Sequence, residues 1–270
     1  MVFISGDDTG GTQGDLLLLT IFTFCMICSV PVLFKFPAPY GKFHDVFDKI
    51  PLVSMKVNWK IGYLLGESPS IWMPLLVTLI YANSVTFPYL LFLILYEVHY
   101  IHRVTIYPFY RVRSRTPSTI LIPIFSFMFQ VVNATCLSKF VLFACSENID
   151  YLSWLKLAIG VAIFLTGMYL NMIADQTLIS LRRSEEDTSY YPPPMNESAI
   201  FRFFVCGNYS MEILEWIGMY VAFSNLATLS FIVTSCCNLI PRAYANHLFC
   251  RKSFKEKYQE PYFIIIPYVF

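Results

Sequence analysis

Three polar side chains share one face of an otherwise apolar stretch, and their types suit the binding of a polar ligand. Asn171, Asp175 and Arg182 are four and then seven residues apart, so a helix places them on one side. An amide and an acid are costly to bury at membrane depth and usually face a partner, a cavity or a ligand. Packing between helices explains this stretch equally well when it is taken alone, so the rest of the chain decides.

Four further polar sets interrupt apolar stretches, mostly toward the expected cytosolic half of the membrane. One such set is often structural, but five are better explained by a shared polar cavity that opens to the cytosol. The sets are Glu67 in GESPS, His99 to Arg103 in HYIHR with Tyr107 beyond, Asn208 with Glu212 and Glu215, and Arg242 with Asn246 and Cys250.

The residue types in these sets indicate the chemistry of the ligand. Arg182 and Arg242, with Arg103 near, suit a phosphate, because a guanidinium binds phosphate through two hydrogen bonds. Asn and Asp at depth suit an amide or a ribose. The chain has no glycine-rich phosphate loop, so helix faces would hold any nucleotide. Glu67 and Tyr100 form a possible acid pair, since a Glu in an apolar pocket can stay protonated and donate a hydrogen bond.

Composition places these sets in a membrane protein. The 270 residues are 56% hydrophobic and only 14% charged, whereas soluble proteins are about 25% charged. A net charge of +1 without a dense basic cluster excludes a nucleic-acid-binding groove. The four histidines form no metal set, and Cys25 and Cys28 lie in an apolar run without further ligands, which argues against a zinc or redox site.

Hydropathy predicts seven membrane helices in one domain, 1–270, with no internal repeat. A span needs about 20 apolar residues. Lys and Arg follow the first, third, fifth and seventh helices, so the N-terminus is expected to face away from the cytosol and the C-terminus into it. The first helix follows an acidic stretch and is expected to be retained. The predicted helices are 15–34, 70–83, 86–110, 118–145, 152–182, 208–221 and 223–241, the second entering the membrane obliquely through 59–70.

The stretch from Ser184 to Ser198 is predicted to be a cytosolic loop or lid. Its three consecutive prolines, Pro192 to Pro194, exclude a regular helix, and its acids and serines favour exposure to water.

At this point the motifs become specific, and the chain resembles the steroid 5α-reductase family of integral membrane reductases over nearly its whole length. The best match is GNYSMEILEWIGM, from Gly207 to Met219, and the region 199–270 is the most family-like. Supporting motifs are Tyr40-Gly41-Lys42, Glu67-Ser68-Pro69-Ser70, His99-Tyr100-x-His102-Arg103, Gly167-Met168-x-x-Asn171-x-x-x-Asp175 and Ile266-Pro267-Tyr268.

The resemblance implies an all-α, seven-transmembrane helix bundle in the endoplasmic reticulum that encloses NADPH and a lipid-like enone. In this family hydride passes to C5 of a 3-oxo-Δ4 steroid, while a Glu and a Tyr hydrogen-bond the 3-keto oxygen. The expected protein is a monomer that binds no metal and no nucleic acid.

The resemblance also assigns roles to residues. Glu67 and Tyr100 would be catalytic and, with Tyr40 and Tyr63, would contact the steroid. The cofactor contacts would be Asn171, Asp175, Arg182, Asn208, Glu212, Arg242, Asn246 and either Tyr190 or Tyr191 of the loop.

Several departures from the family pattern are expected to alter how the cofactor is bound. Gly66 replaces a Gln, Asn246 replaces a His, Cys250 replaces a Tyr, and an Arg near the C-terminus is lost where Tyr258-Gln-Glu-Pro-Tyr262 stands. The family's R-x-P-x-G-G loop is replaced by the proline-rich stretch. The alternatives are a reductase of another lipid enone, such as a trans-2-enoyl-CoA or a polyprenyl lipid, an inactive relative, and a non-catalytic membrane scaffold.

Overall fold

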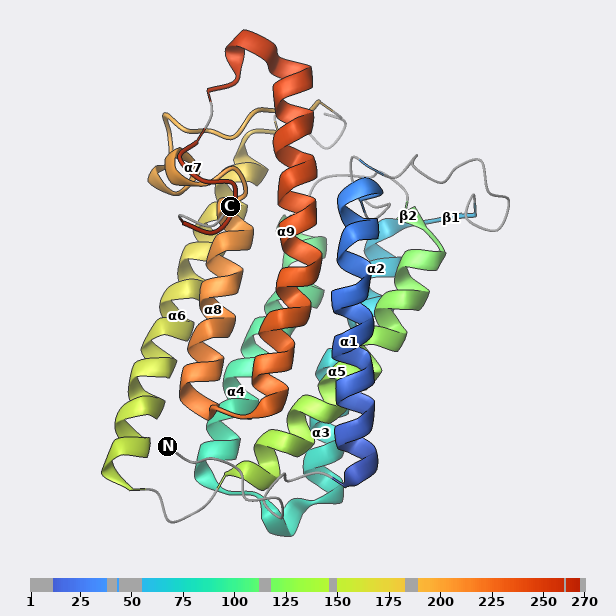
Figure 1. Cartoon of the computed structure of the whole chain (residues 1–270), viewed down its shortest axis with the longest axis vertical. Helices are drawn as coiled ribbons and strands as arrows, with labels where there is room; N and C mark the ends of the chain where they lie inside the picture. The colour runs from blue at the N-terminus through green and yellow to red at the C-terminus, as the bar shows by residue number, and fades with distance from the viewer. Residues whose placement is uncertain are drawn as a thin grey trace.

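A computed structural model describes residues 12–37, 43, 55–111, 118–145, 150–182, 189–259 and 261–267. Figure 1 shows a bundle of helices that run roughly along its long axis, with α6 and α8 side by side and α9 next to α1. The helices are α1 Gln13–Lys35, α2 Trp59–Glu67, α3 Pro69–Ile80, α4 Phe87–Ile101, α5 Leu121–Ala144, α6 Tyr151–Ser180, α7 Ala199–Phe203, α8 Gly207–Phe223 and α9 Leu226–Phe254.

Short elements join and extend these helices. The 3-10 turns η2 Ala82–Ser84 and η4 Lys255–Lys257 follow α3 and α9, and the π-helix η3 His102–Arg111 continues α4. Strands β1 Lys56–Val57 and β2 Ser118–Thr119 pair antiparallel, with Lys56 opposite Thr119. Apart from this strand pair, the regular structure of the described residues is helical.

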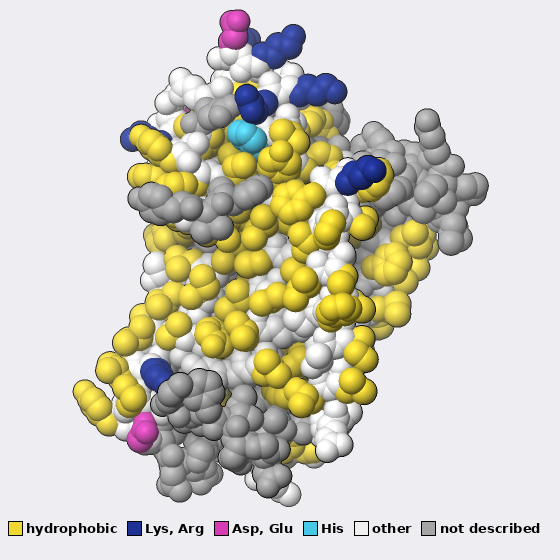
Figure 2. Space-filling view, viewed as in Figure 1, with side chains coloured by type: hydrophobic (Ala, Val, Ile, Leu, Met, Phe, Trp, Pro, Cys, Tyr) yellow, Lys and Arg dark blue, Asp and Glu magenta, His cyan; other side chains and the backbone are white. Residues whose placement is uncertain are grey.

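The lateral surface of the bundle is apolar. Large side chains such as Leu79 and Phe24 are 75% and 65% exposed, which is costly in water but suits contact with lipid. Figure 2 shows hydrophobic side chains across the middle of one face, with Lys and Arg gathered near one end. Five spans among the described residues are long and apolar enough to cross a membrane: 13–35, 59–80, 121–144, 151–180 and 226–257. The protein is therefore a helical, multi-pass membrane protein.

The two other expected spans match shorter helices. The predicted helix 86–110 corresponds to α4, of 15 residues, followed directly by η3, and the predicted helix 208–221 corresponds to α8, of 17 residues. Pro108 lies inside η3 and has no N–H for the helical ladder, which fits the change from α- to π-helical hydrogen bonding. This change determines where Arg103 and Tyr107 project.

Two predicted helix boundaries were wrong. The second span does not begin at residue 70: helix α2, capped by Asn58 and packed on α5, forms one span with α3 over residues 59–80. The last helix does not end at residue 241 but continues past Pro241 to Phe254. The predicted separation of the last two helices is confirmed, with the break at Ser224-Asn225: Ser224 adopts a left-handed conformation, φ 33°, and Asn225 caps α9 with a capping box.

Close packing of α6 on α8 positions the polar residues. A Cβ added at Gly218 would lie 2.3 Å from the backbone nitrogen of Phe164, and one at Gly167 would lie 2.4 Å from that of Glu215. Only glycine allows the two backbones to approach so closely. The contact brings the Asn171–Asp175 face of α6 against the first turns of α8.

Helix α1 is attached much less closely. Only Leu19 is buried in this helix. Its polar contacts are an ion pair between Asp15 and Lys139 Nζ on α5, at 2.6 Å, and a hydrogen bond between the hydroxyls of Thr23 and Ser230 on α9, at 2.5 Å. Thus α1 lies on the rim of the bundle, facing lipid over most of its surface.

The core consists largely of aromatic side chains at the junction of α4, α6, α8 and α9. Trp216 is almost fully buried, and its ring lies 4.5 Å, centroid to centroid, from both His99 and Phe231. Phe92, Tyr96 and Phe164 complete this layer without solvent exposure. The candidate site lies beside it.

Candidate functional site

Arg103 joins three elements at the centre of the polar network. Projecting from η3, its Nη1 donates to Asp175 Oδ2 on α6 at 3.0 Å, and its Nη2 lies 3.6 Å from Glu212 Oε2 on α8. The guanidinium also lies 4.9 Å from the centre of the Tyr107 ring. Two acidic side chains inside the bundle thereby share one cation.

Amide side chains extend this network between α6 and α8. Asn208 Nδ2 donates to Asp175 Oδ1 at 3.0 Å, and Asn171 Nδ2 donates to the Asn208 carbonyl oxygen at 3.2 Å. The structure thus brings together Asn171, Asp175, Asn208 and Glu212, the four expected cofactor contacts that lie on α6 and the start of α8.

Glu67 is held by α5. Its carboxyl group accepts hydrogen bonds from Ser126 Oγ and Gln130 Nε2. Gly66 permits this approach, because a Cβ there would lie 3.0 Å from the backbone of Pro123 on α5. The family's Gln at that position could not pack in this way, so Gly66 and Gln130 together account for one departure.

Tyr100 and Tyr63 both lie near Glu67, and Tyr63 also lies near Arg103. The Tyr100 side chain is buried, with its ring 4.5 Å from that of Tyr96, and it is close enough to Glu67 and Gln130 to interact electrostatically with both. Tyr63 likewise interacts with Glu67, Tyr100 and Arg103. Glu67 and Tyr100 make no direct hydrogen bond in the described structure, so an oxygen held by both would have to lie between them.

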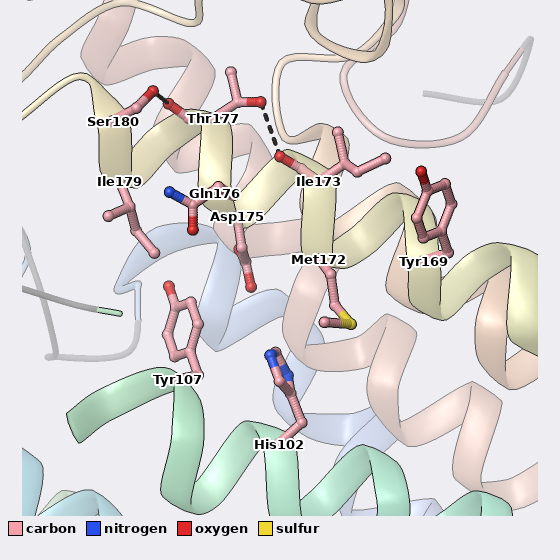
Figure 3. A pocket seen from close by; sticks show the side chains of 10 residues that line it. All are labelled: His102, Tyr107, Tyr169, Met172, Ile173, Asp175, Gln176, Thr177, Ile179 and Ser180. Carbon is pink, nitrogen blue, oxygen red and sulfur yellow. Dashed lines mark hydrogen bonds between the residues drawn. The ribbon is translucent and has the colours of Figure 1, made fainter. Parts of the chain in front are cut away.

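A groove lies between η3 and α6, beside this network. Its volume is about 390 Å³, and Figure 3 shows His102 and Tyr107 on one wall with Met172, Asp175 and Gln176 on the other. Asp175 therefore connects the groove with the Arg103 network. A second cavity, of about 280 Å³, lies at the end of the bundle between the Pro192–Pro194 segment, Lys257 and Tyr258.

The arrangement can hold a carbonyl group near Glu67 and a polar, charged ligand near Arg103.

Comparison with known proteins identifies the family. The family model of 3-oxo-5-alpha-steroid 4-dehydrogenase matches residues 116–270. The chain is 32% identical to steroid 5-alpha-reductase DET2 of Arabidopsis thaliana over 264 residues, 93% of this chain and 97% of the relative. It is 29% identical to human 3-oxo-5-alpha-steroid 4-dehydrogenase 1 over 226 residues, 82% and 84% of the two chains.

The chain belongs to the steroid 5α-reductase family. It is accordingly a member of an oxidoreductase family, and a reductase of this kind implies a nicotinamide cofactor. The resemblance predicted from the motifs is confirmed, whereas the roles of individual residues are not tested by these comparisons.

The family motif around Trp216 also supplies a buried hydrogen-bonded pair. His99 Nδ1 and Glu215 Oε1 are 2.7 Å apart, and Glu215 has no exposed surface. The other carboxyl oxygen, Glu215 Oε2, and the indole Nε1 of Trp216 are buried without a hydrogen-bond partner among the described residues. The core therefore contains one hydrogen-bond acceptor and one donor that no described residue satisfies.

Two further expected cofactor residues, Arg242 and Asn246, contact other side chains at the start of α8. Arg242 Nε donates to Tyr209 OH at 3.0 Å, and its guanidinium lies 5.5 Å from the centre of the Phe43 ring. Asn246 Nδ2 donates to Cys206 Sγ at 3.2 Å.

Arg182, Tyr190 and Tyr40 complete the set of predicted residues. Arg182 is half-buried just after α6 and makes no ion pair with the acids that the structure describes. Tyr190 packs edge-on against Phe249 of α9, with ring centroids 5.2 Å apart. From Ser189 to Ser198 the segment is irregular, as predicted. Tyr40 lies outside the described residues.

Several site residues were not identified from the sequence. Arg103 was noted only as a nearby cation, although it holds both Asp175 and Glu212. Ser126 and Gln130 were missed, although an amide inside the apolar α5 stretch gives the same signal that singled out Asn171. Glu97 was missed too, and it is a carboxyl group in the middle of α4.

Proposed function

We propose that this protein reduces the Δ4 double bond of a 3-oxo-Δ4 steroid to the 5α-reduced 3-oxo steroid, with NADPH as cofactor. The observation that carries the proposal is Glu67, a carboxyl group set inside an apolar bundle beside Tyr100 and fixed by two side chains of α5. This is the arrangement needed to polarise the carbonyl of an otherwise apolar ligand. The names of the relatives support the same substrate class.

In the proposed reaction, Glu67 and Tyr100 donate hydrogen bonds to the 3-keto oxygen of the steroid. These bonds draw electron density toward that oxygen, make C5 electrophilic and stabilise the enolate as the C4–C5 double bond is consumed. NADPH, when bound, supplies the hydride that C5 receives. A proton, drawn ultimately from the solvent, then adds to C4 as the carbonyl re-forms. Ser126 and Gln130 keep the Glu67 carboxyl in place, while the aromatic layer around Tyr96 excludes water.

The residues present fit a nicotinamide dinucleotide. A carboxamide has both a donor and an acceptor, and the unpartnered Glu215 Oε2 and Trp216 Nε1 offer the complementary acceptor and donor. Asn171, Asp175, Asn208 and Glu212 would bind the ribose and amide groups, and Arg242 would bind the diphosphate. Arg182 would recognise the 2′-phosphate, with Asn246 and Tyr190 at the cytosolic end of the site.

The proposal includes seven membrane spans, counting α4 with η3 and α8 in addition to the five long spans. It places the protein in the endoplasmic reticulum membrane as a monomer, with a lumenal N-terminus and a cytosolic C-terminus. The basic residues after α9 favour this orientation.

The deciding experiment is product analysis with microsomes that express the full chain, given NADPH and a panel of Δ4-3-ketosteroids. We expect a 5α-reduced 3-oxo product that is absent from microsomes without the protein. Binding of NADPH without any steroid product would overturn the steroid assignment in favour of another lipid enone. Neither binding nor product would favour a non-catalytic scaffold.

A further inference from the structure

Glu97 is a carboxyl group that the proposed reaction does not use. It lies in the middle of α4, only 9% exposed. Both of its carboxyl oxygens are buried, and neither has a hydrogen-bond partner within the described residues. It precedes Tyr100 by three residues, so the two lie on the same side of α4, about 4.5 Å apart along the helix axis.

Asn133 on α5 is likewise one helical turn from a residue near Glu67, namely Gln130. It follows Gln130 by three residues and is 3% exposed, and its Nδ2 has no partner in the described part of the chain. Tyr100 lies near Gln130 and Tyr89 near Cys145, so α4 and α5 run in opposite directions. Glu97 and Asn133 therefore both lie about one turn deeper in the bundle than the Glu67–Tyr100 centre.

Structural packing alone does not account for this pair. Thr78 Oγ1 and Tyr89 OH nearby form a hydrogen bond of 2.9 Å, but Tyr96 OH and Gln130 Oε1, which are close to the pair in sequence, are also buried without a partner among the described residues. A buried carboxyl or amide group that lacks a partner destabilises a protein, and membrane depth offers no water to replace the partner. Such groups in membrane helices usually face a partner, a cavity or a ligand, and here the described residues supply no partner.

We infer that Glu97 and Asn133 form a second polar subsite, which binds a hydroxyl group on the middle rings of the steroid. The inference rests on the proposed function, because binding of the 3-keto oxygen by Glu67 and Tyr100 would fix the position of the steroid rings along the bundle. A hydroxyl is one donor and an acceptor, so it can donate to a Glu97 carboxyl oxygen and accept from Asn133 Nδ2. One helical turn from the carbonyl corresponds to the middle rings and not to the distant side chain.

The test compares steroids that differ by one hydroxyl. Microsomes with the full chain are given progesterone or its 6-, 7- or 11-hydroxy derivatives, and kcat/KM is measured for each. For at least one hydroxylated steroid we expect a kcat/KM above that of progesterone. The ratio of its kcat/KM to that of progesterone measures the preference for the hydroxyl group. Glu97→Leu should lower this ratio about tenfold, the value of one good hydrogen bond, and Asn133→Leu should lower it as well. Glu97→Gln, which keeps a polar group, should lower it less.

Thr135→Val on α5 is the matched control, because the Thr135 hydroxyl bonds only its own helix backbone, at the Val131 carbonyl oxygen. The ratio of kcat/KM values does not depend on how much folded protein a variant yields. A ratio that is the same in wild type and Glu97→Leu for every steroid would overturn the inference.

Equilibrium binding of the same radiolabelled steroids to purified protein separates this inference from the proposed function. Preferential binding of a hydroxylated steroid that is lost in Glu97→Leu, without any reduction, would support the subsite while refuting the reductase activity. Equal binding of all the steroids by the wild-type protein, or no binding of any, would refute the subsite.

Discussion

At the scale of single residues, the site has two differently built centres. Around Arg103, one cation is shared between two acidic side chains, those of Asp175 and Glu212. Around Glu67, one carboxyl group is surrounded by neutral hydrogen-bonding groups from Ser126 and Gln130. The first arrangement suits the holding of a charged ligand, and the second suits the polarising of a neutral one.

Replacing Glu67 should affect turnover more than cofactor binding. Glu67→Gln keeps the shape of the side chain but removes the acid, and the loss of one donor to a developing oxyanion lowers kcat by about 10² to 10³. We expect the Kd for NADPH to change by no more than about twofold. Steady-state kinetics and NADPH binding on the same preparation test this. Equal losses in both would count against a role in the chemical step.

Removing Arg103 should destabilise the protein. Arg103→Ala leaves Asp175 and Glu212 without their cation, and breaking a buried pair in this way costs about 3 to 5 kcal/mol. Thermal unfolding in detergent should show a clear fall in Tm. Arg202→Ala, on the short helix α7, is the control and should leave Tm unchanged. A wild-type Tm for Arg103→Ala would mean that the network contributes little to stability.

Replacing Arg182 should change the choice of cofactor. Arg182→Ala removes the guanidinium that is proposed to bind the 2′-phosphate, so affinity for NADPH should fall by about tenfold or more while affinity for NADH is retained. Competition between the two nucleotides measures the preference. An unchanged preference would assign the 2′-phosphate to another residue, such as Lys257 at the second cavity.

At the scale of elements, helix positions were predictable because apolar runs, and the polar cap and loop residues that separate them, are local properties of the sequence. The break at Ser224-Asn225 is an example, since an Asn cap is visible in the sequence. The π-helical turn at η3 and the support of Glu67 by Gln130 were not predictable. Glu67 and Gln130 are 63 residues apart, and their contact depends on how closely α2 approaches α5 at Gly66.

The contact between α6 and α8 should not tolerate a side chain at Gly218. In Gly218→Ala the new Cβ would meet the backbone of Phe164 at 2.3 Å, and backbone atoms cannot move aside as a flexible side chain can. We expect little folded protein by size-exclusion chromatography. Gly14→Ala in α1 is the matched control, because its Cβ would lie 3.6 Å from the nearest atom. Normal yield and Tm for Gly218→Ala would contradict the tight packing.

At the scale of the whole molecule, charge and hydropathy together predict how the bundle is oriented. A glycosylation acceptor fused before residue 12 should be modified in microsomes, whereas one fused after residue 267 should not, because an odd number of spans places the ends on opposite sides. Modification of both, or of neither, would mean an even number of spans, and α4 with η3 or α8 would then not cross the membrane.

The weak attachment of α1 also bears on how such a protein can be altered. One ion pair, one hydroxyl contact, ring contacts of Phe22 and Phe34 and a single buried leucine join this helix to α5 and α9, whereas α6 and α8 meet backbone to backbone. Sequence change can therefore accumulate in α1 at little thermodynamic cost, while the α6–α8 pair stays fixed. A chimera that takes its first helix from a relative would keep its fold, which makes α1 the practical place to begin redesign.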